Sequence, residues 1–155
     1  MEIVSSMSMN PYARDDAFHF PVRVFYEDTD AGGVVYHANF LNFSERARTE
    51  WLRHLTIGRE RLQHEFSLMF VVRRATIEWR RPARLDDLLM VETRLQGMGK
   101  VRMSLRQTIT RDETHLATID IEVVAVSVKD FTPMLLPQAL RDLLPAAPVM
   151  EEKRA

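Results

Sequence analysis

The spacing of apolar residues changes twice along the chain, and each spacing predicts a different secondary structure. Val22, Val24 and Tyr26 alternate with the residues between them, which predicts a strand that begins at Pro21 and ends near residue 27. From Asn39 to residue 55 the spacing becomes three or four, which predicts one long amphipathic helix. Its apolar stripe is Phe40, Phe43, Ala47, Trp51 and Leu55.

Alternation returns after a short helical segment at 59–64 and continues over most of the remaining chain. It predicts four strands at 69–81, 88–96, 101–109 and 117–125, with a turn at residues 97–99, and a last short helix at 137–144. One helix cannot cover five strands from one edge of a sheet. We therefore expect an α+β fold in which an antiparallel five-stranded sheet curves around the apolar helix.

Length and composition limit the organisation and the partners. The 155 residues suffice for one domain, placed at 19–145 between a disordered arm at 1–18 and a flexible tail at 146–155. The 21 basic and 22 acidic side chains nearly cancel, so no nucleic-acid partner is expected. Without cysteine there is no disulfide, thiolate metal site or cysteine nucleophile. No apolar run could insert into a membrane and no signal peptide is evident, which predicts a cytoplasmic protein.

Residues suited to chemistry gather between the first strand and the helix. The segment 26–40 contains three acids, the pair Gly32-Gly33 and His37. Paired glycines let the backbone approach a ligand closely, and the start of a helix presents unpaired N–H groups with a partial positive charge. Such donors can hold an oxyanion, while a neighbouring carboxylate can act as a base or a nucleophile. Asp28 is interpreted instead as a residue that stabilises the turn.

Four stretches of the sequence resemble the hotdog-fold acyl-CoA thioesterases. They are YEDTDAGGVVYHANF at 26–40, ERARTEWLR at 45–53, FVVR at 70–73 and PARLDD at 82–87. The resemblance is greatest to the Tol–Pal-associated (YbgC-like) branch of the 4-hydroxybenzoyl-CoA thioesterase superfamily. It extends over about residues 20–137. It implies a hotdog fold, hydrolysis of acyl-CoA to a carboxylic acid and CoA, and no metal or other cofactor.

The resemblance also implies roles for particular residues. Asp30 falls on the catalytic carboxylate of the family, and His37, seven residues later, falls on a histidine associated with catalysis. Whether Asp30 activates a water molecule or itself attacks the thioester stays open. Sites of this family form between subunits, so at least a homodimer is expected, and a homotetramer by resemblance. The backbone donors to the thioester oxygen fall on Gly33, Val34, Val35 and Tyr36.

A basic segment after the helix has two interpretations. Its arginines can contact the phosphates of CoA, for which the guanidinium fork is suited, or they can form a solvated strand face with salt bridges. The residues concerned are Arg73, Arg74, Arg81 and Arg84. The Tol–Pal association of the family adds acyl carrier protein and enzymes of phospholipid synthesis as candidate partners.

Other functions compete with thioester hydrolysis. Hotdog hydratases and dehydratases place a histidine five residues after their aspartate, whereas seven residues separate Asp30 from His37. The second alternative is a module that binds acyl-CoA or acyl carrier protein without catalysis. A serine hydrolase would need a G-x-S-x-G elbow, which the sequence lacks. The five histidines do not have the spacing of metal ligands.

Overall fold

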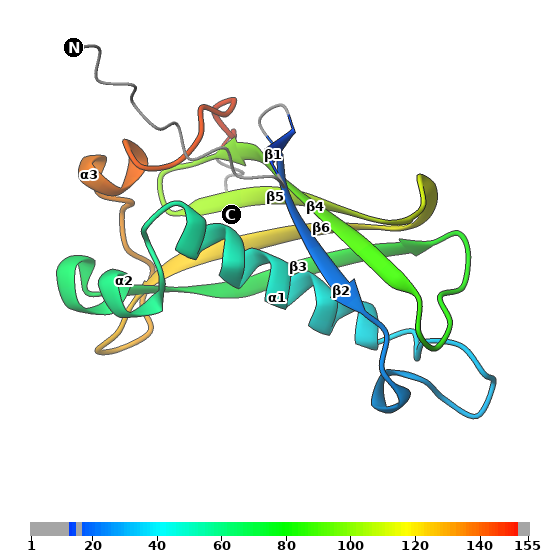
Figure 1. Ribbon diagram of the computed structural model, residues 1–155. Coiled ribbons are helices and arrows are strands. Elements are labelled where there is room, and N and C mark those ends of the chain that lie inside the picture. The colour runs from blue at the N-terminus through cyan, green and yellow to red at the C-terminus, as the bar shows by residue number, and fades with distance from the viewer. Residues whose placement is uncertain (1–12, 15–16, 152–155) are drawn as a thin grey trace, which may run out of the picture.

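A computed structural model of the chain describes residues 13–14 and 17–151. They form one antiparallel sheet of six strands in the order β1-β2-β4-β5-β6-β3, and the helix α1 lies across one face of it (Figure 1). The predicted α+β hotdog architecture, a sheet wrapped around one long helix, is therefore confirmed, although the two-residue strand β1 adds a sixth strand to the five that were predicted. The elements are β1 (Ala13–Arg14), β2 (Ala17–Arg23), η1 (Tyr26–Asp28), α1 (Asn39–His54), α2 (Arg59–Phe66), β3 (Leu68–Trp79), β4 (Leu88–Met98), β5 (Arg102–Arg111), β6 (Thr114–Ser127) and α3 (Gln138–Arg141).

The first main strand lies earlier in the chain than its alternation predicts. β2 begins at Ala17 rather than Pro21 and ends at Arg23, and the next residues form the 3₁₀ turn η1 instead of continuing the strand. The predicted continuation of the strand to residue 27 was wrong because the Asp28 side chain accepts a hydrogen bond from the backbone N–H of Phe25, which closes the turn. The long helix and the four later strands agree with prediction to within a few residues, while α3 is shorter than the predicted helix at 137–144.

Both ends of the described chain pair with the sheet. Most of the arm expected at 1–18 lies outside the described residues, but its described parts, 13–14 and 17–18, belong to β1 and β2. The tail expected from residue 146 is described as far as Glu151. Within it, the Pro148 carbonyl and the Met150 N–H bond to the backbone of Met98 at 2.9 and 3.1 Å. Gly97 makes room for this tail, since a Cβ there would lie 2.7 Å from Met150 Cγ.

The core lies between α1 and the concave face of the sheet. The helix buries Phe40, Phe43, Ala47 and Trp51, which recur at the three- and four-residue spacing read from the sequence. Opposite them the sheet contributes inward-facing residues that are almost fully buried: Leu89, Val91, Leu105, Ile109, Ile119 and Ile121. This packing fixes the axis of α1, and with it the position of the first turn of the helix.

Candidate functional site

Asp28 connects the end of β2 to the start of α1. Its side chain is 4% exposed. Oδ2 accepts a hydrogen bond from the backbone N–H of Phe25 at 2.8 Å, and Oδ1 accepts one from the side-chain amide of Asn39 at 2.8 Å. The Asp28 carbonyl accepts a third bond, from the N–H of Tyr36 at 2.9 Å. The interpretation of Asp28 as a residue that stabilises the turn is therefore confirmed.

Asp30 lies two residues further, in an exposed part of the same loop. Its N–H donates to the carbonyl of Val34 and its carbonyl accepts from the N–H of Gly33, both at 3.0 Å, in a tight turn where Gly33 has a φ of +77°. The carboxylate accepts one bond, from the N–H of Gly32 at 2.8 Å, and has no other hydrogen-bond partner among the described residues. The loop thus holds the Asp30 carboxylate near the start of α1 and leaves it open to solvent in a single chain.

His37 lies beside the end of β3. The indole Nε1 of Trp79 donates to the His37 carbonyl at 3.2 Å, and the two rings meet edge to face with centroids 5.8 Å apart. The His37 side chain is exposed. Within the described part of the chain, no hydrogen bond joins its imidazole to Asp30. The two predicted catalytic residues therefore share one loop without a direct hydrogen bond.

Most of the backbone donors predicted at residues 33–36 already have acceptors in the folded chain. The N–H groups of Gly33, Val35 and Tyr36 donate to the carbonyls of Asp30, Ala83 and Asp28. Among the described residues, the N–H of Val34 meets no acceptor, and neither do those of His37 and Ala38, directly before α1. The sequence does not single out the free N–H groups at positions 37 and 38, because residue types do not reveal which amides the folded chain already uses.

Of the four candidate CoA-binding arginines, Arg84 is held closest to the loop of Asp30. Its Nη1 lies 3.5 Å from the carbonyl of Gly33, and its backbone N–H donates to the Asp87 carboxylate at 2.9 Å. Burial raises the pKa of Asp87. Hydrogen bonds from Arg84 and from the Arg111 guanidinium outweigh this effect and hold that pKa below its usual value. Asp87 therefore stays ionised and fixes the segment that carries Arg84.

The remaining arginines are distributed along β3 and beyond its end. Arg73 and Arg74 precede Trp79 by six and five residues, so each lies about 17–20 Å from Trp79 along the strand. Arg73 is also paired with Glu122 at 3.0 Å. Arg81 is exposed and follows Trp79 by two residues. The fold of one chain therefore brings Arg84 next to the loop of Asp30 and leaves Arg73 and Arg74 far along β3.

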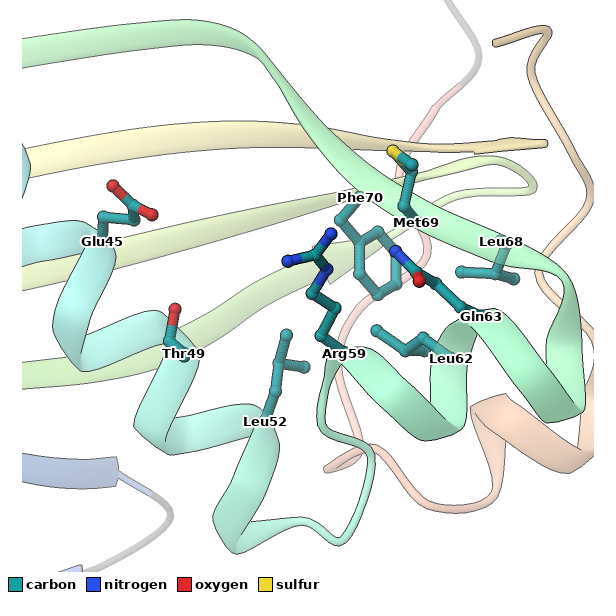
Figure 2. Close-up of a pocket in the computed structure, with 9 residues that line it drawn as sticks. All are labelled: Glu45, Thr49, Leu52, Arg59, Leu62, Gln63, Leu68, Met69 and Phe70. Carbon is teal, nitrogen blue, oxygen red and sulfur yellow. The ribbon is translucent and has the colours of Figure 1, made fainter. Parts of the chain in front are cut away.

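Besides a cavity of about 260 Å³ that borders Glu27 and Asp28 at the end of β2, two cavities lie further along α1. One of about 330 Å³ opens between α1, α2 and β3, and Figure 2 shows side chains from all three elements around it. A second, of about 280 Å³, lies between α1 and the sheet and shares Glu45, Thr49, Leu52 and Phe70 with the first. Neither cavity is lined by Asp30 or His37. No particular role was predicted from the sequence for Thr49 or Arg59.

β3 is an outer strand of the sheet, and its free edge is long. It pairs only with β6 among the described strands, and it has twelve residues. Several of its apolar side chains reach solvent, with Val72 at 51% and Trp79 at 45% exposed. Unpaired N–H and C=O groups along such an edge form a template for pairing with another strand.

The described residues contain neither a candidate membrane-spanning helix nor a candidate metal cluster. No helix there has the length and apolarity to cross a membrane. No group of three or more His, Cys, Asp or Glu side chains there is arranged to hold a metal ion.

Comparisons with known proteins agree with the architecture. The family model described as "Thioesterase superfamily" matches residues 32–118. The chain is 43% identical over 127 residues to the acyl-CoA thioesterase YbgC of Haemophilus influenzae, which covers 82% of this chain and 93% of that protein. It is 45% identical over 124 residues to the acyl-CoA thioester hydrolase YbgC of Escherichia coli O6:H1, covering 79% and 92%. The crystal structure of a probable thioesterase from Bartonella henselae superposes with a TM-score of 0.75 at 37% identity, covering 78% of this chain and 99% of that one.

Proposed function

Because the chain belongs to the thioesterase superfamily, we propose that it hydrolyses acyl-CoA to a free carboxylic acid and CoA at the loop between β2 and α1. The observation that carries the proposal is the extent of the likeness to the two curated relatives. Identity of 43–45% extends over more than nine-tenths of proteins named for acyl-CoA thioester cleavage. The open carboxylate and the free N–H groups in this loop supply the chemistry that such cleavage needs.

The proposed reaction uses two parts of the loop. The thioester carbonyl oxygen accepts hydrogen bonds from the N–H groups of His37 and Ala38, where the partial positive charge at the start of α1 stabilises an oxyanion. Asp30 takes a proton from water, and the water oxygen adds to the carbonyl carbon. The tetrahedral intermediate collapses, the C–S bond breaks, and CoA leaves as a thiolate that takes up a proton. In the other route, Asp30 adds to the carbon itself, the C–S bond breaks as CoA leaves, and water then hydrolyses the resulting anhydride to the carboxylic acid and free Asp30.

Part of the CoA moiety is proposed to bind beside the same loop. Arg84 lies against Gly33, and Arg81 is three residues before it with an exposed side chain. Both can offer guanidinium donors to phosphate oxygens. Arg73 and Arg74 serve this purpose only if a second subunit brings them to the site of the first. The family association with acyl carrier protein and phospholipid-synthesis enzymes stays a prediction from the resemblance, as does the Tol–Pal link. Cytoplasmic location stays a prediction from the sequence pattern.

We further propose that the enzyme is at least a homodimer formed through β3. The free edge and the exposed apolar side chains at Val72 and Trp79 support a second copy pairing there. Sedimentation should give at least twice the chain mass of 18.1 kDa at micromolar concentration. A homotetramer, as the resemblance suggests, would give four times that mass. A particle with the mass of one chain would contradict the dimer.

His37→Ala is expected to lower kcat/KM by roughly tenfold to hundredfold, less than the full loss of an acid–base group, because Asp30 remains. The melting temperature should change little, since the exposed imidazole makes only ring contacts with Tyr36 and Trp79 among the described residues. Steady-state kinetics and thermal unfolding measure both quantities. His64→Ala, at an exposed position of α2, is the matched control. Unchanged kinetics in His37→Ala would leave His37 with a structural role only.

Release of free thiol from short, long and aromatic acyl-CoAs, measured together with hydration of crotonyl-CoA, tests the reaction class. The proposal predicts thiol release from at least one thioester and no hydration. Hydration without thiol release would instead identify a hydratase. Binding of acyl-CoA without either reaction would identify a binding module.

A further inference from the structure

The cavity between α1 and the sheet contains a half-buried cation, Arg48. The cavity has a volume of about 280 Å³. The other charged residue on its wall, Glu45, is exposed and makes no ion pair with Arg48 in the described part of the chain. Burial lowers the pKa of Arg48, while the charge of Glu45 raises it. The rest of the wall is mainly apolar: Trp51, Leu52, Phe70, Val72, Met103, Leu105 and Val123, with Thr49.

A buried hydrogen-bond network fixes the Arg48 guanidinium. Nη1 donates to Ser44 Oγ at 2.7 Å and to Gln107 Oε1 at 3.0 Å. The Gln107 amide nitrogen donates to the Ser44 carbonyl at 2.9 Å and to Thr93 Oγ1 at 3.0 Å, so this amide has no freedom to flip. Ser44, Thr93 and Gln107 are all fully buried. The network therefore presents the guanidinium in one orientation.

Most of the hydrogen-bonding capacity of Arg48 remains unused. A guanidinium has five N–H donors, and Nη1 uses its two. The N–H groups of Nε and Nη2 find no acceptor among the described residues. These donors remain accessible to solvent within the cavity, and a carboxylate that enters it can accept two parallel bonds from such a fork. The Glu45 carboxylate on the same wall does not bond these N–H groups, which leaves them available to an anionic group that enters the cavity.

We propose that this cavity takes the acyl group of the substrate and that Arg48 selects acyl groups with a carboxylate at their far end. The inference rests on the proposed thioesterase function and names its substrate class, the CoA thioesters of short dicarboxylic acids. An aliphatic acyl group of equal size would fill the apolar wall and leave the Arg48 donors unpaired.

Two paths through the fold give the length of that acyl group. Along α1, Ser44 lies six residues from Ala38, or about 9 Å. Along the sheet, Gln107 is in register with Ile119 and Ile119 with Ile77, which lies about 10 Å away across two strand spacings. Ile77 is two residues or about 7 Å from Trp79, which bonds the His37 carbonyl, so Gln107 and Trp79 are about 12 Å apart. An extended chain gains about 1.2 Å per bond, so an acyl group of about four to six carbons spans from the helix start to the guanidinium.

Matched pairs of thioesters test the proposal. Glutaryl-CoA and 5-methylhexanoyl-CoA have end groups of the same shape, but only the first carries a carboxylate. We expect the wild type to have a kcat/KM for glutaryl-CoA at least tenfold above that for its neutral partner, the effect of one charged hydrogen bond. Arg48→Met should reduce this ratio to about one, and Arg48→Lys, which keeps the charge without the fork, should give an intermediate ratio. Arg46→Met, an exposed arginine of the same helix outside this cavity, should leave the ratio unchanged.

Other outcomes would overturn the inference. A wild type that prefers the neutral thioester, or a preference for glutaryl-CoA that survives in Arg48→Met, removes the role of Arg48. The role of Arg48 is also removed if Arg48→Met changes the oligomeric mass of the protein but not its preference between the two thioesters. Arg48 would then pair with a carboxylate of a second copy. If no thioester at all is cleaved, the proposed function fails, but this result alone does not decide the inference about Arg48. Titration of glutaryl-CoA into wild type and Arg48→Met then still decides the inference, which requires weaker binding to the variant.

Discussion

Asp28→Ala is expected to lower the melting temperature by about 5–15 °C. The substitution removes a buried carboxylate that accepts hydrogen bonds from Phe25 and Asn39, and it leaves both donors without their partner. A hydrogen bond to a charged group contributes about 1.5–3 kcal/mol, and at this chain length each kcal/mol shifts the melting temperature by about 2–4 °C. Thermal unfolding followed by circular dichroism measures the change.

The control for this prediction is Glu27→Ala. Glu27 precedes Asp28 directly and its side chain is exposed, so its loss should change the melting temperature by no more than about 2 °C. Thioester hydrolysis should also fall in Asp28→Ala, because the loop is no longer tied to α1. A melting temperature equal to that of the wild type would show that the contacts of Asp28 do not hold the loop.

Periodicity in the sequence was sufficient for the main elements of the fold. The apolar stripe of α1 and the alternation in β5 and β6 follow from burial on one face, which depends on side-chain type alone. The same rule failed at the end of β2, where Tyr26 continues the alternation but is 82% exposed. A local hydrogen bond from Phe25 to Asp28 decides the backbone there, and periodicity contains no information about it.

The network around Arg48 had a signal in the sequence that went unused. Gln107 occupies an inward-facing position of β5, between Leu105 and Ile109, and Ser44 lies within the buried stripe of α1. A polar residue at a core position must find a hydrogen-bond partner, so each should have been read as half of a buried pair. That Arg48 joins them depends on how α1 crosses the sheet, which local patterns do not give.

The roles of the two neighbouring aspartates are separated by their surroundings. Asp28 is buried with both oxygens bonded, whereas Asp30 is exposed with one bond from Gly32. Asp30→Asn retains an oxygen for the Gly32 N–H and nearly the same shape, so the loop should keep its structure. It loses the negative charge that a base or a nucleophile requires. We therefore expect thioester hydrolysis to fall by about 10²–10⁴-fold with an unchanged melting temperature.

The central claim is that the Asp30 carboxylate acts on an acyl-CoA thioester bound at the start of α1. Its most direct test is the rate of thiol release by wild type, Asp30→Asn and Glu27→Gln, at equal concentrations of folded protein and with the best acyl-CoA substrate. We expect Asp30→Asn to release thiol at about one-hundredth of the wild-type rate or less, while Glu27→Gln should match the wild type. An Asp30→Asn variant that cleaves the thioester as fast as the wild type would contradict it.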